Sequence, residues 1–190
     1  MKRPEDLILP VGIGLGLLFL FSGPDTEPPG YHPPPGIPKT PTDFIRKYWN
    51  EALKSQQATT IPALFTITQA GLESGWGRSA PRFNFFGIKD SAAWKGDTQL
   101  LTTREYINGQ WITVQDRFRA YPDARSAFVD HGIFFIVTPR YKSALQFTND
   151  NIKFTRAISA AGYATDPDYA DKLIDAMKIV VQVLQSYGMI

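Results

Sequence analysis

A single carboxylate, Glu73, stands inside the segment Q-A-G-L-E-S-G-W-G, which spans residues 69–77. A run with helical spacing leads into this segment, and the Gly–Trp–Gly turn ends it. A carboxylate there lies near the negative end of the helix dipole, among apolar and aromatic residues, and both influences raise its pKa. Retaining a proton near neutral pH is what a general acid requires. The alternative interpretation is a solvated Glu at a helix end.

A second carboxylate, Glu105, lies in a predicted β-hairpin. Two runs of alternating polarity flank Asn108 and Gly109, a pair that is the strongest short-range hairpin signal. Strand alternation places Leu101, Thr103 and Glu105 on one face. A hairpin inserted in a helical domain often forms one wall of a cleft, so Glu105 is the best candidate partner for the first carboxylate. The alternative is an exposed strand Glu with no catalytic role.

The loop after Gly77 reads R-S-A-P-R-F-N-F-F-G-I-K and is dense in aromatic residues. As part of a site, these rings offer a sugar apolar faces for stacking, and Asn84 offers an amide donor and acceptor. As part of the core, they need no further purpose. His131, in a later apolar run, is more often a core or surface histidine than a catalyst.

Composition excludes several classes of function. The 190 residues carry a net charge of +2 from 20 basic and 18 acidic residues, and no basic block stands out, so nucleic acid is not an expected partner. Cysteine is absent and there are two histidines, which argues against thiol chemistry and against a zinc site. We therefore predict no metal and no cofactor. No G-x-S-x-G motif supports a serine hydrolase.

Residues 7–21 are uncharged and follow Lys2 and Arg3. With flanking residues they approach the length of about 20 that a membrane-spanning helix needs. The acidic Asp25 and Glu27 beyond the segment favour an inside N-terminus, with the remainder of the chain outside. The alternatives are a cleaved signal peptide, although no A-x-A-like site follows, and a buried core helix.

Eight of the 15 prolines fall between residues 24 and 41. Such a segment favours a semi-rigid polyproline spacer, which at about 3.1 Å per residue spans some 50 Å. A proline-rich ligand for a partner domain is the alternative. The expected organisation is a membrane anchor or signal-like segment at 1–23, a spacer at 24–41 and one catalytic domain at 42–190.

The remainder of the domain has helical spacing, which makes the predicted fold class α+β and mainly α. The first helix begins with Thr40 as its cap, and residues 55–60 are predicted to be a loop. Further helices are expected from residue 61, over 123–137 and from Asn149 or Asp150. The last is expected to have Asp166 as cap and Pro167 as its first residue, with a buried face of Tyr169, Leu173, Met177, Val180, Leu184 and Tyr187.

Several separated motifs resemble those of one known family. In chain order they are A-G-L-E-S-G-W-G, N-F-F-G-I-K, T-R-E-Y, F-R-A-Y-P-D, P-R-Y and G-Y-A-T-D-P-D-Y-A. Over residues 44–184 the chain resembles the bacterial glucosaminidases, family 73 of the glycoside hydrolases, which includes flagellar rod-associated hydrolases and autolysins. The resemblance implies a lysozyme-like fold with a small β-hairpin lobe along a groove. It also implies cleavage of the β-1,4 bond after N-acetylglucosamine in peptidoglycan.

The resemblance also assigns roles to residues. Glu73 matches the family's essential acid, Glu105 matches the carboxylate of the hairpin, and Tyr163 matches a tyrosine near the catalytic centre. The positions that match groove-lining or substrate-binding residues are Gln69, Trp76, Asn84, Phe86 and Tyr121. Gly71 departs from the pattern, because an Ala is common there.

The second step of the reaction has two alternatives. If Glu105 lies roughly 6.5–9.5 Å from Glu73, it can activate water and invert configuration. A larger separation favours attack by the acetamido group of the substrate, with Tyr163 positioning that group.

Two rival functions stay open, as does the biological setting. One rival is a muramidase or lytic transglycosylase on the same fold, and the other is a non-catalytic peptidoglycan-binding module. The expected partners are peptidoglycan strands, a membrane through the N-terminal helix, and envelope or virion assemblies. The catalytic domain is expected on the periplasmic or cell-wall side, where it opens the wall for an envelope machine or for a phage.

Overall fold

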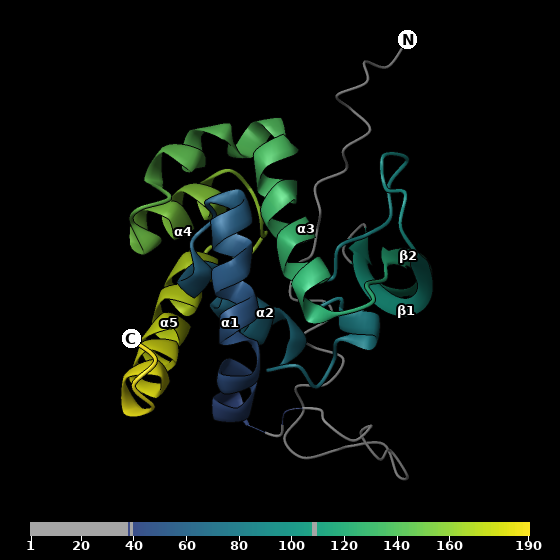
Figure 1. Ribbon diagram of the computed structural model, residues 1–190. Coiled ribbons are helices and arrows are strands. Elements are labelled where there is room, and N and C mark those ends of the chain that lie inside the picture. Colours follow the sequence, from purple (N-terminus) through teal and green to yellow (C-terminus); the bar gives the residue numbers. More distant parts are fainter. Residues whose placement is uncertain (1–37, 39, 108–109) are drawn as a thin grey trace.

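A computed structural model describes Pro38, residues 40–107 and residues 110–190, with residues 104–107 and 111 described by their backbone alone. The fold is mainly helical with one two-stranded antiparallel sheet (Figure 1), which confirms the predicted mixture of elements. The elements are α1 Pro41–Thr59, α2 Ala63–Ser74, η3 Pro81–Phe83, β1 Thr98–Ile107, β2 Gln110–Arg119, α3 Ala124–Val137, η4 Pro139–Phe147, α4 Asn151–Ala160 and α5 Tyr169–Ser186.

The predicted anchor, residues 1–23, lies outside the described residues, as does nearly all of the predicted spacer. Within the part of the chain that the structure describes, no helix combines the length and apolar character needed to cross a membrane.

Helix α1 begins as the sequence predicts and ends later than expected. The Thr40 hydroxyl accepts from the backbone N–H of Asp43, which caps the first turn. The helix then continues through the region predicted to be a loop and ends at Thr59. The buried Ser55 hydroxyl donates to the Phe128 carbonyl at 2.8 Å, and the Thr59 hydroxyl donates to the Ser55 carbonyl. The loop prediction was therefore wrong, because a carbonyl of α3 accepts from the Ser55 hydroxyl, and the backbone of α1 itself accepts from the Thr59 hydroxyl.

Helix α2 lies at the centre of the domain and packs against α1, α4 and α5. Phe65, Ile67 and Ala70 have no exposed surface. Two buried clusters meet at this helix: one lies toward α1 and the aromatic loop, and the other toward α4, η4 and α5. Burial on nearly all sides holds α2, and with it Glu73, in a fixed position.

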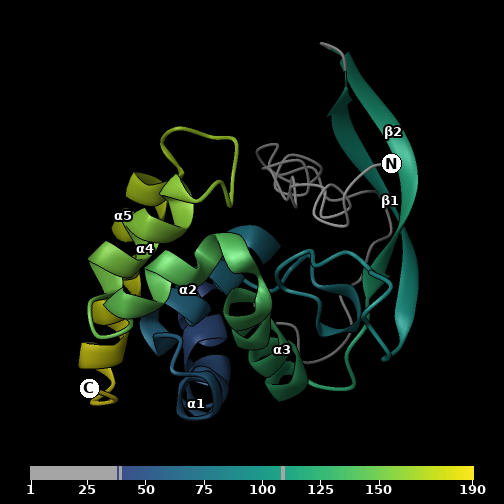
Figure 2. The ribbon, with the colours of Figure 1, turned by 90° about the horizontal axis from the view of Figure 1, so that it is seen from above.

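The hairpin forms in the predicted register, and Ile107 pairs with Gln110 on either side of the two residues expected to make the turn. Those two residues lie outside the described part. At the base of the hairpin, the Arg119 guanidinium donates to both carboxylate oxygens of Asp130 in α3, at 2.8 and 2.9 Å. The same guanidinium packs over the Trp94 ring. The far end of the hairpin extends beyond the helical body (Figure 2), so this base fixes the angle of the lobe.

The start of the last helix differs from the prediction. Helix α5 begins at Tyr169, after an Asp168 cap, because the Asp166 side chain accepts from the Asp168 N–H and forms an ion pair with Lys172. The predicted buried face is confirmed except at Tyr187, which is half exposed and follows the helix end. Helix η4, between α3 and α4, was not predicted.

The crossing of α1 and α3 depends on Gly132. A Cβ there would lie 2.5 Å from Thr59 Oγ1 and 2.8 Å from Thr59 Cβ. Gly→Ala normally stabilises a helix interior by about 1 kcal/mol. Here we expect Gly132→Ala to destabilise the domain by about 1–3 kcal/mol in urea unfolding, because the two helices must separate. The control, Val137→Ala on the exposed side of α3, should stay within about 0.5 kcal/mol. A stabilised Gly132→Ala variant would contradict this packing.

Candidate active site

Glu73 lies in the last turn of α2, directly before a left-handed turn that ends the helix. The turn consists of Gly75, Trp76 and Gly77, with φ of 59°, 61° and 86°. The Gly75 N–H donates to the Gly71 carbonyl, and so does the Trp76 N–H, at 2.6 Å. A left-handed Trp is strained backbone of the kind that concentrates at functional sites. This turn confirms the predicted helix end and places Glu73 at the edge of the core.

The Glu73 carboxyl is almost completely buried, with 7% of the residue exposed. Burial raises its pKa from 4.5 to about 7, and a hydrogen bond from Tyr169 partly opposes this shift. A carboxyl group with this pKa is about half protonated at neutral pH. The predicted rise in pKa therefore has its cause mainly in burial.

A tyrosine hydroxyl donates to Glu73, and the tyrosine is Tyr169 at the start of α5. Its Oη lies 2.8 Å from Glu73 Oε1. Tyr163, which the sequence resemblance singled out, is buried beside it, with the two rings stacked 5.6 Å apart. Burial, followed by the charge of Glu73, raises the pKa of both tyrosines well above 10. Both hydroxyls therefore keep their protons at any pH at which the protein would act.

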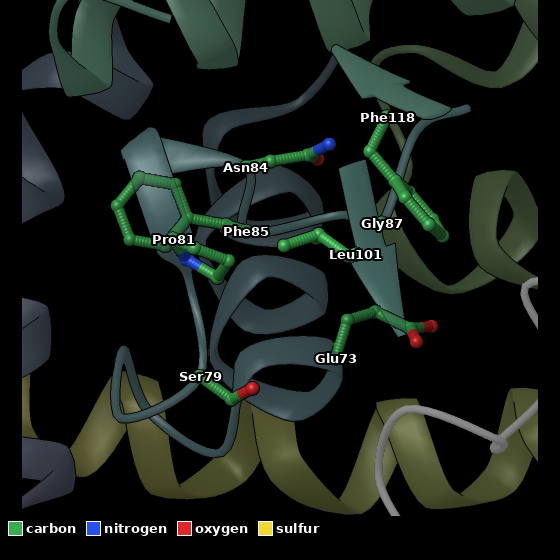
Figure 3. A pocket seen from close by; sticks show the side chains of 8 residues that line it. All are labelled: Glu73, Ser79, Pro81, Asn84, Phe85, Gly87, Leu101 and Phe118. Carbon is green, nitrogen blue, oxygen red and sulfur yellow. The ribbon is translucent and has the colours of Figure 1, made fainter. Parts of the chain in front are cut away.

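A small pocket beside Glu73 is lined by β1, η3 and the aromatic loop. In Figure 3, Leu101 of β1 lies between Phe85 and Glu73, and Ser79 lines the lower edge. The Glu105 backbone pairs with Ile112 and lies four residues beyond Leu101, about 13 Å further along β1. Strand β1 therefore leads from the pocket beside Glu73 toward the far end of the hairpin.

The five residues predicted to bind substrate occupy different environments. Asn84 is buried, and its amide bonds the Ile88 backbone and the Arg119 carbonyl. The Tyr121 hydroxyl donates to Asp130, and Phe86 has no exposed surface. Asn84 therefore holds the loop together, Tyr121 stabilises the base of the hairpin, and Phe86 is part of the core.

Gln69 is also fully buried. Of the five residues, Trp76 is the one that is partly exposed, and it follows Glu73 by three residues. Its ring packs on Gly71 and Phe44. A Cβ at Gly71 would lie 2.5 Å from that ring, which explains the glycine where an alanine is common.

Two residues of the site were missed or undervalued from sequence. Tyr169 was assigned only to a buried helical face, although a buried tyrosine hydroxyl needs a hydrogen-bond partner. His131 was taken as a core residue, which it is: its ring stacks on Phe86 at 3.6 Å. Its Nε2 also lies 2.7 Å from Gln69 Oε1. The available signal was the position of Gln69, one helical turn before Glu73 on the same face.

Among the described residues, no group of three or more acidic or histidine side chains is arranged to hold a metal ion. The chemistry available at the site is proton transfer by one buried carboxyl, with a tyrosine hydroxyl donating to it.

A family model described as mannosyl-glycoprotein endo-beta-N-acetylglucosaminidase matches residues 49–180. The chain belongs to this family. The match begins in α1, ends in α5 and includes Glu73, the hairpin and both tyrosines. The domain therefore belongs to the glycoside hydrolases, as its motifs indicated.

Named relatives and solved structures agree with this assignment. The chain is 35% identical to the peptidoglycan hydrolase FlgJ of Salmonella typhimurium, over 72% of this chain and 49% of that protein. It is 35% identical to a "Probable N-acetylmuramidase" of Lactococcus lactis, over 56% of this chain and 26% of that protein. A crystal structure of a peptidoglycan hydrolase mutant from Sphingomonas sp. A1 superposes with a TM-score of 0.67 at 38% identity, covering 76% of this chain and 99% of that one. This likeness confirms the expected glucosaminidase-type fold. The chain spans about half the length of the FlgJ relative, or less for the muramidase.

The raised pKa of Glu73 makes a prediction about stability. A carboxyl whose pKa is 4.5 unfolded and about 7 folded stabilises the fold only while protonated, so this contribution is lost as pH rises through 7. Glu73→Gln removes the titration, and we expect its gain in unfolding free energy to be about 2 kcal/mol larger at pH 8 than at pH 5. Urea unfolding at both pH values measures this. Glu51→Gln, at a surface ion pair with Lys54, is the control and should show no such pH dependence. An equal gain at both pH values would contradict the buried, protonated carboxyl.

Proposed function

We propose that the chain is a peptidoglycan hydrolase, an endo-β-N-acetylglucosaminidase with Glu73 as its general acid. The observation that carries the proposal is the burial of Glu73, which gives it a pKa of about 7 at the edge of a pocket. Family membership supplies the class of bond, and the named relatives act on peptidoglycan.

In the proposed first step, the Glu73 carboxyl gives its proton to the glycosidic oxygen, and the bond from that oxygen to the sugar C1 breaks. The leaving sugar takes the proton, and positive charge develops on C1 and the ring oxygen. Glu73 becomes a carboxylate in the same step. The Tyr169 hydroxyl, which already donates to it at 2.8 Å, then stabilises the new charge.

The second step has the two candidate routes that the sequence left open. In one, Glu105 activates a water molecule, which attacks C1 from the opposite face and inverts configuration. In the other, the acetamido group of the substrate attacks C1, and Tyr163 positions it. Tyr163 stacks on Tyr169 and lies close enough to Glu73 for the charge of that carboxylate to raise the tyrosine pKa, and this proximity to the acid supports the second route.

Two alternative functions remain to be compared: a muramidase or lytic transglycosylase with the same fold, and a non-catalytic module that binds the same glycan. A muramidase would cleave the alternate bond of the same glycan, a reading favoured by the name of the Lactococcus relative. A non-catalytic binding module would retain the groove without needing a buried acid. The cost of burying Glu73 argues against that module, because binding alone gains nothing from it.

We further propose that residues 1–23 anchor the chain in a membrane and that the proline-rich residues 24–41 hold the domain on the outer side. An uncharged stretch at 7–21 between basic and acidic flanks supports this. There the enzyme would open the wall for an envelope machine or for a phage during penetration or lysis.

The activity is tested with purified peptidoglycan. Glu73→Gln should lower turbidity clearing by at least about 1000-fold, because Glu73 is the acidic side chain among the described residues that line the pocket. Glu105→Gln should have little activity if Glu105 takes the proton of the attacking water. It should retain partial activity if the acetamido oxygen attacks C1, because water then opens the resulting cyclic intermediate to give the reducing-end sugar. Full activity of a folded Glu73→Gln variant would disprove the assignment.

Mass spectrometry of the released fragments identifies the bond. The proposal predicts reducing-end N-acetylglucosamine. Reducing-end muramic acid would identify a muramidase, and anhydro-muramic acid a lytic transglycosylase. Binding to peptidoglycan without new reducing ends would identify the non-catalytic module.

The anchor is tested by fractionation. The full chain should remain with membranes after carbonate washing, and a variant lacking residues 1–23 should be released and retain its activity. A full chain found in the carbonate supernatant, or a mature protein cleaved after the apolar segment, would contradict the anchor.

A further inference from the structure

A continuous chain of buried hydrogen bonds runs from the core to Glu73. His131 Nε2 lies 2.7 Å from Gln69 Oε1, Gln69 Nε2 donates to Tyr169 Oη at 2.7 Å, and Tyr169 donates to Glu73. His131 and Gln69 have no exposed surface, so neither reaches substrate. The four residues come from three elements, with His131 in α3, Gln69 and Glu73 in α2, and Tyr169 in α5.

The direction of the protons in this chain follows from its inner end. His131 Nδ1 is buried and has no hydrogen-bond partner among the described residues. A proton on Nδ1 would be a buried, unpaired donor, which is costlier than a bare acceptor nitrogen. The proton therefore belongs on Nε2, where it donates to Gln69. Burial lowers the pKa of His131 to about 3, so the ring stays neutral.

That assignment fixes every link beyond it. With its oxygen held by His131, the Gln69 amide must present its NH₂ group to Tyr169. The Tyr169 oxygen then accepts from Gln69, and its own proton is left for Glu73. With the amide reversed, Tyr169 would donate to Gln69 and lose its bond to the carboxylate.

We propose that Gln69 and His131 are positioning residues, which hold the Tyr169 hydroxyl with its proton directed at Glu73. The inference rests on the proposed role of Glu73 as general acid. The bond matters most after proton transfer, when Glu73 carries a buried negative charge. Gln69 was expected from sequence to bind substrate. Instead it is connected to the reacting Glu73 carboxyl through two hydrogen bonds, by way of Tyr169.

The inference predicts a shift in the pH profile. The titratable groups that face Glu73 in the described structure are Tyr163 and Tyr169, and both stay protonated. Loss of the directed Tyr169 bond removes an interaction that favours the carboxylate, so the pKa of Glu73 rises further. Activity requires the protonated acid, so the alkaline limb of the kcat profile moves to higher pH while kcat itself falls.

Two substitutions at His131 separate positioning from packing. His131→Phe keeps an aromatic ring against Phe86 but removes the donor, whereas His131→Gln loses the ring and keeps a donor near the same point. With the full-length protein and soluble peptidoglycan fragments, we expect His131→Phe to lower kcat about 10-fold, with KM changed less than about 2-fold. Its alkaline limb should move up by about half a pH unit. His131→Gln should stay within about 3-fold of the wild type.

The control is Thr66→Val, which removes a buried hydroxyl of α2 that has no hydrogen-bond partner in the described structure. It should leave kcat and the pH profile unchanged. The inference is overturned if His131→Phe matches the wild type, or if His131→Gln is as impaired as His131→Phe. Either result with an inactive Glu73→Gln variant leaves the general acid in place, so the two hypotheses fail separately.

A measurement on the wild type covers the case in which the variants do not fold. The ¹⁵N shifts of the His131 ring distinguish a protonated Nε2 with a bare Nδ1 from the opposite tautomer. The chain requires the first. A proton on Nδ1 would reverse the amide and overturn the inference.

Discussion

The hydrogen bond between Tyr169 and Glu73 is the interaction on which the rest of the site depends. It joins α2 to α5 across 96 residues of sequence, inside a core that excludes water from both partners. Burial alone would raise the pKa of the carboxyl further. The tyrosine hydroxyl moderates that effect and leaves a pKa of about 7. The surrounding helices keep both side chains buried and within hydrogen-bonding distance of each other.

Much of the fold was predictable from local signals. The Thr40 cap, the glycine-flanked turn after α2 and the Asn108–Gly109 hairpin signal each act over a few residues. The positions of helices and strands follow from them. The two errors have different origins. At residues 55–60 a partner on α3 accepts from the Ser55 hydroxyl inside a helix, whereas at the start of α5 the Asp166 side chain accepts from the Asp168 N–H two residues further on.

The raised pKa of Glu73 was predictable from sequence, and the environments of the residues around it were less so. Glu73 was identified from its position at a helix end, and the family motifs agree. Periodicity and motif matching do not reveal whether a matched polar residue faces the groove or the core. Asn84 and Tyr121 match groove positions, yet their polar atoms bond the hairpin base. Tyr169 and His131 reach Glu73 through contacts more than 60 residues apart, which no local pattern records.

The central claim is that the fold raises the pKa of one carboxyl to about 7, so that about half of it keeps a proton at neutral pH for delivery to a glycosidic oxygen. Titration of the Glu73 side-chain carbon by ¹³C NMR, assigned by comparison with Glu73→Gln, measures that property without substrate. The account predicts a midpoint near pH 7. A midpoint near 4.5, the ordinary value for a solvated glutamate, would contradict it.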